Sequence, residues 1–167
     1  GLSQEMSRRI TTEFISFKRL YPEFLYPGGV EDSDPDFDVN ETATLRIRRI
    51  ITYYNPITWI RAGWIAHAEV VHLQWWSMPL APIYIVLLLV LKARKKKIIF
   101  TVHNVVPHER SIFDYRLTKT VLSFGDAFIV HSKRNQTDLI ECLQLSEDKV
   151  RVVHMPVHDM YGRREIG

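Results

Sequence analysis

The sequence predicts an α/β protein built on a parallel, doubly wound β-sheet. Short runs rich in Val, Ile and Phe alternate with segments of helical periodicity, and this alternation is typical of β-α-β units. The runs do not alternate cleanly between apolar and polar residues, which indicates strands covered on both faces. Five runs are expected to be strands: 13–18, 69–75, 97–103, 126–132 and 149–154.

Capping residues mark two helix starts and one helix end. Asn55 followed by Pro56 is a cap with proline in the first turn, so a helix is expected from residue 56. Ser132 follows a predicted strand and is placed to cap the helix that ends in the sequence DLIECL. Gly125 is expected to end a helix whose apolar residues recur over 113–124.

Two further helices are expected from apolar spacing. One spans residues 79–92, and the other follows Asn40, with an inward face formed by Leu45, Ile47, Ile50, Ile51 and Tyr54. The segment 19–41 breaks the alternation, because it is rich in proline and glycine and acidic over 31–38. It is interpreted as a surface excursion or, in its aromatic first half, as a flap.

The composition is that of a soluble globular domain. The chain has 167 residues, of which 46% are hydrophobic and 25% charged, with a net charge of +3. These values fit one domain with its own core, and the charge is too small to indicate nucleic-acid binding. The single cysteine, Cys142, excludes an internal disulfide. A cytoplasmic location is expected, because no secretion signal opens the chain.

The most apolar run, residues 83–91, is far shorter than the roughly 20 residues that span a membrane, so a buried helix is expected. A second interpretation is peripheral contact with the inner face of the cell membrane, because the run ends in Lys92, Arg94, Lys95, Lys96 and Lys97. Trp75 and Trp76 suit membrane contact, although core packing or stacking on a sugar explains them equally well.

Polar side chains gather where the predicted strands end. They are Lys18 and Arg19, His72 and Gln74, Thr101, His103 and Asn104, His131 and Ser132, and His154. Because parallel strands end at one edge of a sheet and ligands bind in the crevice there, these residues are expected to line a site.

Strand-end histidines also have a purely structural explanation, a hydrogen bond to a neighbouring backbone group, which we favour for His131 and His154. His103 differs, because Asn104, His108 and Glu109 follow it closely.

No metal site is expected at residues 103–109, because the spacing fits no common zinc motif and Pro107 interrupts any aligning helix. Ser132 lacks the glycines of a nucleophile elbow. It is expected to cap a helix whose N-terminus faces an anion such as phosphate.

Four motifs in this order resemble the N-terminal domain of family 4 glycosyltransferases: VVHLQWW, IIFTVHNVVPHE, DAFIVHS and VRVVHMPVHDMY. The resemblance covers about residues 13–161. It implies a Rossmann-like domain, residues 1–161, which forms one half of a GT-B enzyme, with 162–167 as the start of the interdomain linker. It also implies retaining transfer of a hexose from a nucleotide sugar.

The resemblance assigns roles to matching positions. His103 would act in catalysis beside the transferred sugar, and Asn104, His108 and Glu109 would line the acceptor side of the cleft. Ser132 would face the same cleft. His72 and Gln74 are expected to bind substrate as well, because of their position at a strand end. Gly1 would belong to a glycine-rich loop that approaches the donor phosphates. In the family this loop follows a first strand, which is central in the sheet.

The family also implies the partners. These are a UDP- or GDP-sugar as co-substrate without a metal or other cofactor, a glycan or lipid-linked acceptor, and a C-terminal domain that grips the donor. Since that second domain's motifs are not in this sequence, the chain alone is expected not to transfer sugar. The alternative is a non-catalytic α/β module that binds a carbohydrate or a nucleotide.

Overall fold

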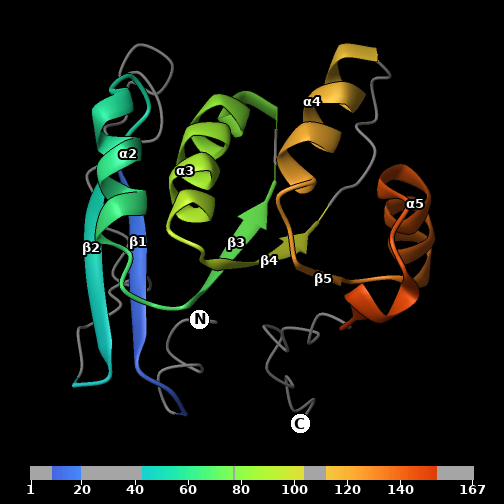
Figure 1. Ribbon diagram of the computed structural model, residues 1–167, viewed down its shortest axis with the longest axis horizontal. Helices are drawn as coiled ribbons and strands as arrows, with labels where there is room; N and C mark the ends of the chain where they lie inside the picture. Colours follow the sequence, from blue (N-terminus) through green and yellow to red (C-terminus); the bar gives the residue numbers. More distant parts are fainter. Residues whose placement is uncertain (1–8, 20–42, 77, 104–111, 154–167) are drawn as a thin grey trace, which may run out of the picture.

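The computed structural model describes residues 9–19, 43–76, 78–103 and 112–153. These residues form six β-strands, four α-helices and two short 3₁₀ helices. Every strand pairs in parallel with its neighbour, and Figure 1 shows α-helices alternating with strands from β2 onward. The α/β class with parallel strands is therefore confirmed.

The first sheet contains two strands, β1 (Thr12–Arg19) and β2 (Leu45–Thr52). β2 shows that the helix expected after Asn40 is wrong over this stretch. The order Leu45-Arg46-Ile47-Arg48 alternates as a half-buried strand does, and its isoleucines are β-branched, which favours a strand. The same apolar positions also fit a helical period, and this ambiguity misled the sequence-based interpretation.

The second sheet has four strands in the order of the sequence. They are β3 (Val70–Trp75), β4 (Lys97–Val102), β5 (Ala127–Val130) and β6 (Val150–Val152). The runs expected as strands are confirmed, with ends shifted by a few residues. The sequence predicts one sheet, but the described strands form two, because β1 and β3 are not paired with each other.

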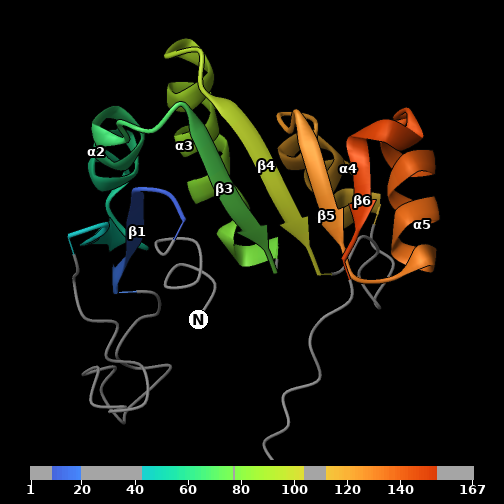
Figure 2. The ribbon, with the colours of Figure 1, turned by 90° about the horizontal axis from the view of Figure 1, so that it is seen from below.

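Four helices connect these strands: α2 (Pro56–Ile65), α3 (Ala81–Ala93), α4 (Ile112–Leu122) and α5 (Lys133–Leu143). A one-turn 3₁₀ helix (Met78–Leu80) leads into α3, and another (Glu147–Lys149) leads into β6. Crossovers between parallel strands are right-handed, so strands that follow one another across a sheet place their helices on one face. Figure 2 shows the sheet in front of α3 and α4.

The helix caps confirm the sequence-based prediction at both starts. Asn55 accepts a hydrogen bond from the Ile57 N–H at 3.1 Å, and Ser132 accepts one from the Asn135 N–H at 3.1 Å. Gly125 follows α4, and its N–H donates to the Leu122 carbonyl at 2.9 Å.

Packing also requires glycine at position 125. A Cβ atom there would lie 2.4 Å from the Phe128 ring, far inside van der Waals contact. Glycine lets the turn after α4 pass close to β5, so this position serves packing as much as helix termination.

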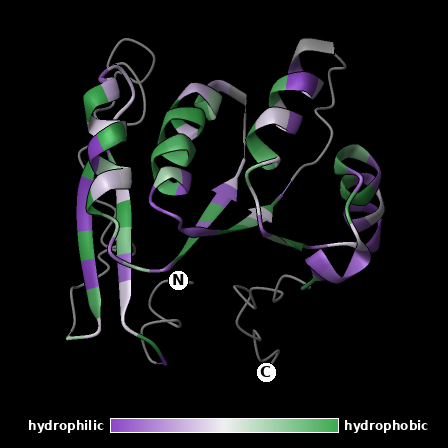
Figure 3. Cartoon of the chain, viewed as in Figure 1, coloured by the Kyte–Doolittle hydropathy of each residue, from purple (hydrophilic) through white to green (hydrophobic). Residues whose placement is uncertain are grey.

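The core lies between the four-stranded sheet and its helices. Ile98, Phe100 and Val102 of β4 are fully buried, and Leu88 and Leu91 of α3 are buried with them. Figure 3 shows the apolar residues concentrated on α3 and on the strands beneath it. Burial of such side chains is the main stabilising contribution, about 1.5–3 kcal/mol for each large apolar side chain.

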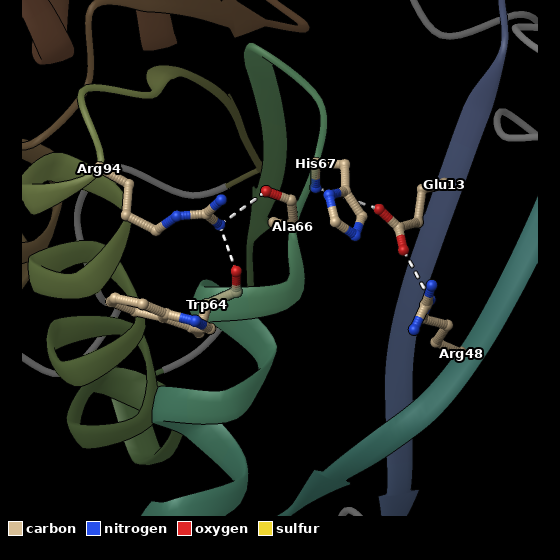
Figure 4. A network of polar contacts seen from close by, with 6 residues as sticks. All are labelled: Glu13, Arg48, Trp64, Ala66, His67 and Arg94. Atoms are coloured by element: carbon tan, nitrogen blue, oxygen red, sulfur yellow. Dashed lines mark hydrogen bonds and ion pairs between the residues drawn. The ribbon is translucent and has the colours of Figure 1, made fainter.

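Polar contacts connect the two sheets where α2 leads into β3, as Figure 4 shows. Glu13 of β1 forms an ion pair with Arg48 of β2 at 2.6 Å. The other oxygen of Glu13 accepts a hydrogen bond from the His67 N–H at 3.4 Å. A single carboxylate therefore ties both strands of the first sheet to the segment that enters the second.

The expected excursion over 19–41 lies almost wholly outside the described residues, except Arg19, which ends β1. His154 and the expected linker start at 162–167 also lie outside them.

Candidate functional site

Strand register brings three aromatic side chains together at the carboxyl edge of the four-stranded sheet. Trp75 is aligned with Val102, and Val102 with Val130, across neighbouring strands. The next residue of each strand is therefore placed in a row, and these residues are Trp76, His103 and His131. The edge is the one at which parallel sheets bind ligands.

His103 stacks on Trp76. The ring centroids are 4.0 Å apart and the ring planes differ by 18°. The His103 N–H donates to the Trp75 carbonyl at 3.3 Å, which holds the backbone beside β3. Trp76 remains 57% exposed, so much of this aromatic side chain is open to a ligand.

His131 lies on the other side of His103. Their ring centroids are 5.0 Å apart, with the planes at 45°. Burial, and after it the neighbouring His131, lowers the pKa of His103. A lowered pKa keeps His103 neutral near pH 7, so its ring offers one N–H donor and one lone pair.

A backbone hydrogen bond determines which nitrogen of the neutral His131 ring carries the proton. Nδ1 lies 2.9 Å from the Val153 carbonyl oxygen, which can only accept, so Nδ1–H is the donor. Nε2 of the neutral ring is then an acceptor. This backbone bond confirms the structural explanation favoured from the sequence, but it accounts for only one of the two ring nitrogens.

Two buried nitrogens at this edge are unsatisfied. Nε2 of His103 and Nε2 of His131 are both removed from solvent, and neither has a hydrogen-bond partner among the described residues. Buried polar atoms without partners are rare and call for an explanation. A ligand with hydroxyl groups would satisfy both.

The N-terminus of α5 completes the edge. Ser132 caps the helix, so its hydroxyl oxygen is already engaged with the Asn135 N–H. The Asn135 side chain donates from Nδ2 to the His103 carbonyl at 3.2 Å. Asn135 thus fixes the start of α5 against the end of β4.

His72 lies within β3, on a face of the sheet. Its Nε2 is 2.7 Å from the Thr101 hydroxyl oxygen, and burial lowers the pKa of His72. It stands three residues before the end of β3, whereas Trp76 follows that end. Gln74 lies on the same face by strand alternation, and its carbonyl accepts a hydrogen bond from the Tyr84 hydroxyl at 2.5 Å.

The structure therefore brings His103 and Ser132 to one edge, where Asn135 contacts both. It places His72 and Gln74 within β3, on the face of the sheet that leads to that edge. Four other expected residues lie outside the described residues: Gly1, Asn104, His108 and Glu109. Within the described ranges, no three histidine, cysteine or acidic side chains are grouped as a metal site requires.

Two residues of the edge, Trp76 and Asn135, were not assigned to the site from the sequence, and His131 was placed at the strand ends but given a structural explanation. For Trp76 a signal existed, because strand alternation places one tryptophan of the pair inward. Trp75 is that residue, with 2% exposure in the core. The expectation that Trp75 contacts a membrane is therefore wrong.

Comparison with protein families finds a match over residues 24–159 to the model described as Glycosyltransferase Family 4. A search of curated proteins finds no significant match to the chain.

Proposed function

The chain belongs to glycosyltransferase family 4, and from this we propose that it supplies the acceptor-binding half of the active site of a retaining hexosyltransferase. The donor would be a nucleotide sugar, such as a UDP- or GDP-sugar. A second, donor-binding domain would close over the edge formed by Trp76, His103 and His131.

The observation that carries this proposal is the pair of buried imidazole nitrogens, without partners in the described part of the chain, beside an exposed tryptophan. A sugar presents hydroxyl groups at its rim and C–H groups on its faces. The hydroxyl groups can form hydrogen bonds with the Nε2 atoms of His103 and His131. The C–H face can stack on the indole ring of Trp76.

His103 suits a role next to the reacting sugar. Its ring is held by Trp76 on one side and its carbonyl by Asn135, so its orientation is set before a ligand binds. A neutral imidazole in that position can accept a hydrogen bond from a hydroxyl group or donate one. A correctly aligned hydroxyl group reacts far faster than one that is free in solution.

The reaction class fits such a site. In glycosyl transfer the bond between the anomeric carbon and the diphosphate breaks, and a bond from the acceptor oxygen to that carbon forms. The acceptor hydroxyl loses its proton, which the departing diphosphate can take up. The transition state resembles an oxocarbenium ion, so catalysis depends largely on alignment and on stabilising the leaving diphosphate. The N-terminus of α5, at the same edge, has the polarity that favours an anion.

The proposal predicts a division of labour that a transfer assay can test. Labelled UDP- and GDP-sugars would be incubated with acceptor glycans and with this chain, either alone or joined to a donor-binding domain of the family. We expect transfer only in the joined protein. Transfer by the chain alone would contradict the proposed acceptor-only role, and absence of transfer across all donors in the joined protein would argue against the proposed reaction.

A further inference from the structure

The solvent-facing side of α2 is apolar. Ile57, Ile60 and Trp64 are 73%, 47% and 67% exposed. They recur at intervals of three and four residues, which places them on one side of the helix together with Arg61. The opposite side of α2 is buried and consists of Trp59, Ala62 and Gly63.

α3 continues this surface. Its buried side faces the core, yet its outer positions are apolar as well, since Pro82 is exposed and Leu89 is 54% exposed. Gly63 of α2 lies directly against Val90 of α3, so the two helices are neighbours in the same layer. We call the exposed set Ile57, Ile60, Arg61, Trp64, Pro82 and Leu89 the α2–α3 outer face.

The other two helices of the layer have polar outer faces. Their exposed positions are Tyr115, Arg116, Lys119 and Thr120 on α4, and Lys133, Arg134, Thr137 and Glu141 on α5. In overall composition, Figure 3 shows α3 as mostly apolar, whereas α5 mixes hydrophilic and apolar residues. Packing against the sheet explains the inner side of all four helices, but not an apolar outer side on two of them.

Positive charge borders the α2–α3 outer face. Residues 53–97 contain a single acidic residue, Glu69, whereas their basic residues are Arg61, Lys92, Arg94, Lys95, Lys96 and Lys97. Neither α2 nor α3 contains an acidic residue. A partner for this face would therefore have an apolar region bordered by negatively charged groups.

Several of the basic side chains at the end of α3 are already engaged. Lys92 pairs with Asp126 at 2.7 Å, and Lys96 donates to the His67 carbonyl at 3.0 Å. Arg94 donates to the carbonyls of Gly63 and Ala66 at 3.0 and 2.8 Å. The basic end of α3 thus largely stabilises the fold.

Arg94 and Trp64 form a cation–π pair at the border of this face. The guanidinium carbon lies 5.6 Å from the indole centroid, and Arg94 also donates to the Trp64 carbonyl (Figure 4). These contacts hold the exposed indole beside a fixed positive charge. Tryptophan next to arginine is the combination found where proteins meet the headgroup region of a bilayer.

We propose that the α2–α3 outer face docks the protein on an anionic lipid bilayer. Ile57, Ile60 and Leu89 would enter the boundary between headgroups and acyl chains, and Trp64 would sit at headgroup level. Arg61 would face the lipid phosphates. None of the described helices has the length and hydropathy to cross a membrane, so the contact is peripheral.

A second copy of the chain is a less suitable occupant. In a symmetric dimer the same patch meets itself, so two surfaces bordered by positive charge would be brought together. A bilayer with anionic headgroups offers opposite charge instead. The proposal does not depend on the proposed catalytic role, because it concerns another surface and requires no turnover.

Vesicle binding tests the proposal. The chain is mixed with phosphatidylcholine vesicles with or without phosphatidylglycerol, and bound protein is measured by flotation. We expect binding only with phosphatidylglycerol, decreasing as salt rises. Arg61→Glu and the double variant Ile57→Ser, Ile60→Ser should each lower the partition coefficient about tenfold or more. Lys119→Glu on α4 makes the same charge change and should leave binding as it is.

Tryptophan emission identifies the surface that docks. Trp64 and Trp76 are both exposed, and we expect vesicles to shift the emission of the wild type and of Trp76→Phe, but not of Trp64→Phe. Absence of binding, or binding that these α2 variants leave unchanged, would overturn the proposal. It would also be overturned if vesicles shifted only Trp76, or if the chain self-associated in solution and the α2 variants abolished that association.

Discussion

His72 and His103 come from neighbouring strands, yet their environments differ. His72 lies on a face of the sheet with the Thr101 hydroxyl 2.7 Å from its Nε2. His103 follows the end of β4, stacks on Trp76, and has a buried Nε2 without a partner in the described part of the chain. Among the described residues, Nε2 of His72 has a partner and Nε2 of His103 has none.

A lowered pKa does not separate the two residues. Burial lowers the pKa of both His72 and His103, and only for His103 does a second histidine add to the effect. The two residues differ in whether Nε2 has a hydrogen-bond partner and in whether the ring lies on a face or at the end of a strand. An imidazole with a buried partner contributes to stability, whereas one with a buried and unsatisfied nitrogen at a sheet edge is available to a ligand.

The largest effect is expected from His103→Ala. In the chain joined to a donor-binding domain of the family, kcat for transfer should fall by about 100-fold or more, as is usual when a positioned polar group is lost from a reacting centre. The free energy of unfolding should change by less than about 1 kcal/mol, because His103 lies at the edge of the fold. Steady-state kinetics and urea unfolding measure the two quantities. Wild-type turnover would remove His103 from the site.

Trp76→Ala should act mainly on binding. We expect the KM for the acceptor to rise about tenfold, with a smaller change in kcat, because the indole offers a stacking surface and takes no part in bond breaking. Trp76→Phe should retain part of the affinity. A fall in kcat with unchanged KM would instead show that Trp76 acts by holding the His103 ring in place.

Two substitutions separate the roles of the two ring nitrogens of His131. Asparagine resembles the Nδ1 side of the ring and can keep the bond to Val153, so His131→Asn should fold normally and lower kcat/KM about fivefold to tenfold. His131→Gln should lose about 1 kcal/mol of stability with the Val153 bond and retain more activity. If His131→Asn were fully active, Nε2 would have no role in ligand binding.

Protonation of His72 should make the free energy of unfolding depend on pH. Its pKa is lower in the folded state than in the unfolded chain, so the unfolded chain takes up the proton first as pH falls. The stability linked to neutral His72 is complete above the ordinary histidine pKa of about 6.5 and is lost at lower pH. His72→Gln cannot titrate there and should flatten the decline between pH 7 and pH 5, with kcat unchanged. Thermal unfolding at several pH values measures this, and an unchanged pH slope would contradict it.

Much of the fold could be predicted from local signals. Asn55-Pro56 and Ser132 marked helix starts, because capping depends on residues close in sequence. β2 could not be separated from a helix by apolar spacing, because Leu45, Ile47 and Ile51 fit either period. The division into two sheets depends on which strands pair, and no local pattern specifies that.

The sequence indicated which segments of the chain form the site, but it did not indicate which side chains there would lack a partner. Strand ends pointed to His103 and Ser132 at one edge, but whether a strand-end side chain finds a partner depends on the neighbouring strand. Thr101 satisfies His72, and Val153 satisfies only one nitrogen of His131. Those contacts join residues distant in sequence, so they became visible only in the structure.

The most direct test of the contrast between these histidines is nuclear magnetic resonance of the imidazole C–H signals. Methyl glycosides of common hexoses would be titrated into the chain at neutral pH, with His72→Gln, His103→Ala and His131→Asn used to assign the signals. The account predicts that the signals of His103 and His131 shift with added glycoside, while that of His72 stays in place. A shift at His72 alone, or no shift at any histidine with any glycoside, would contradict it.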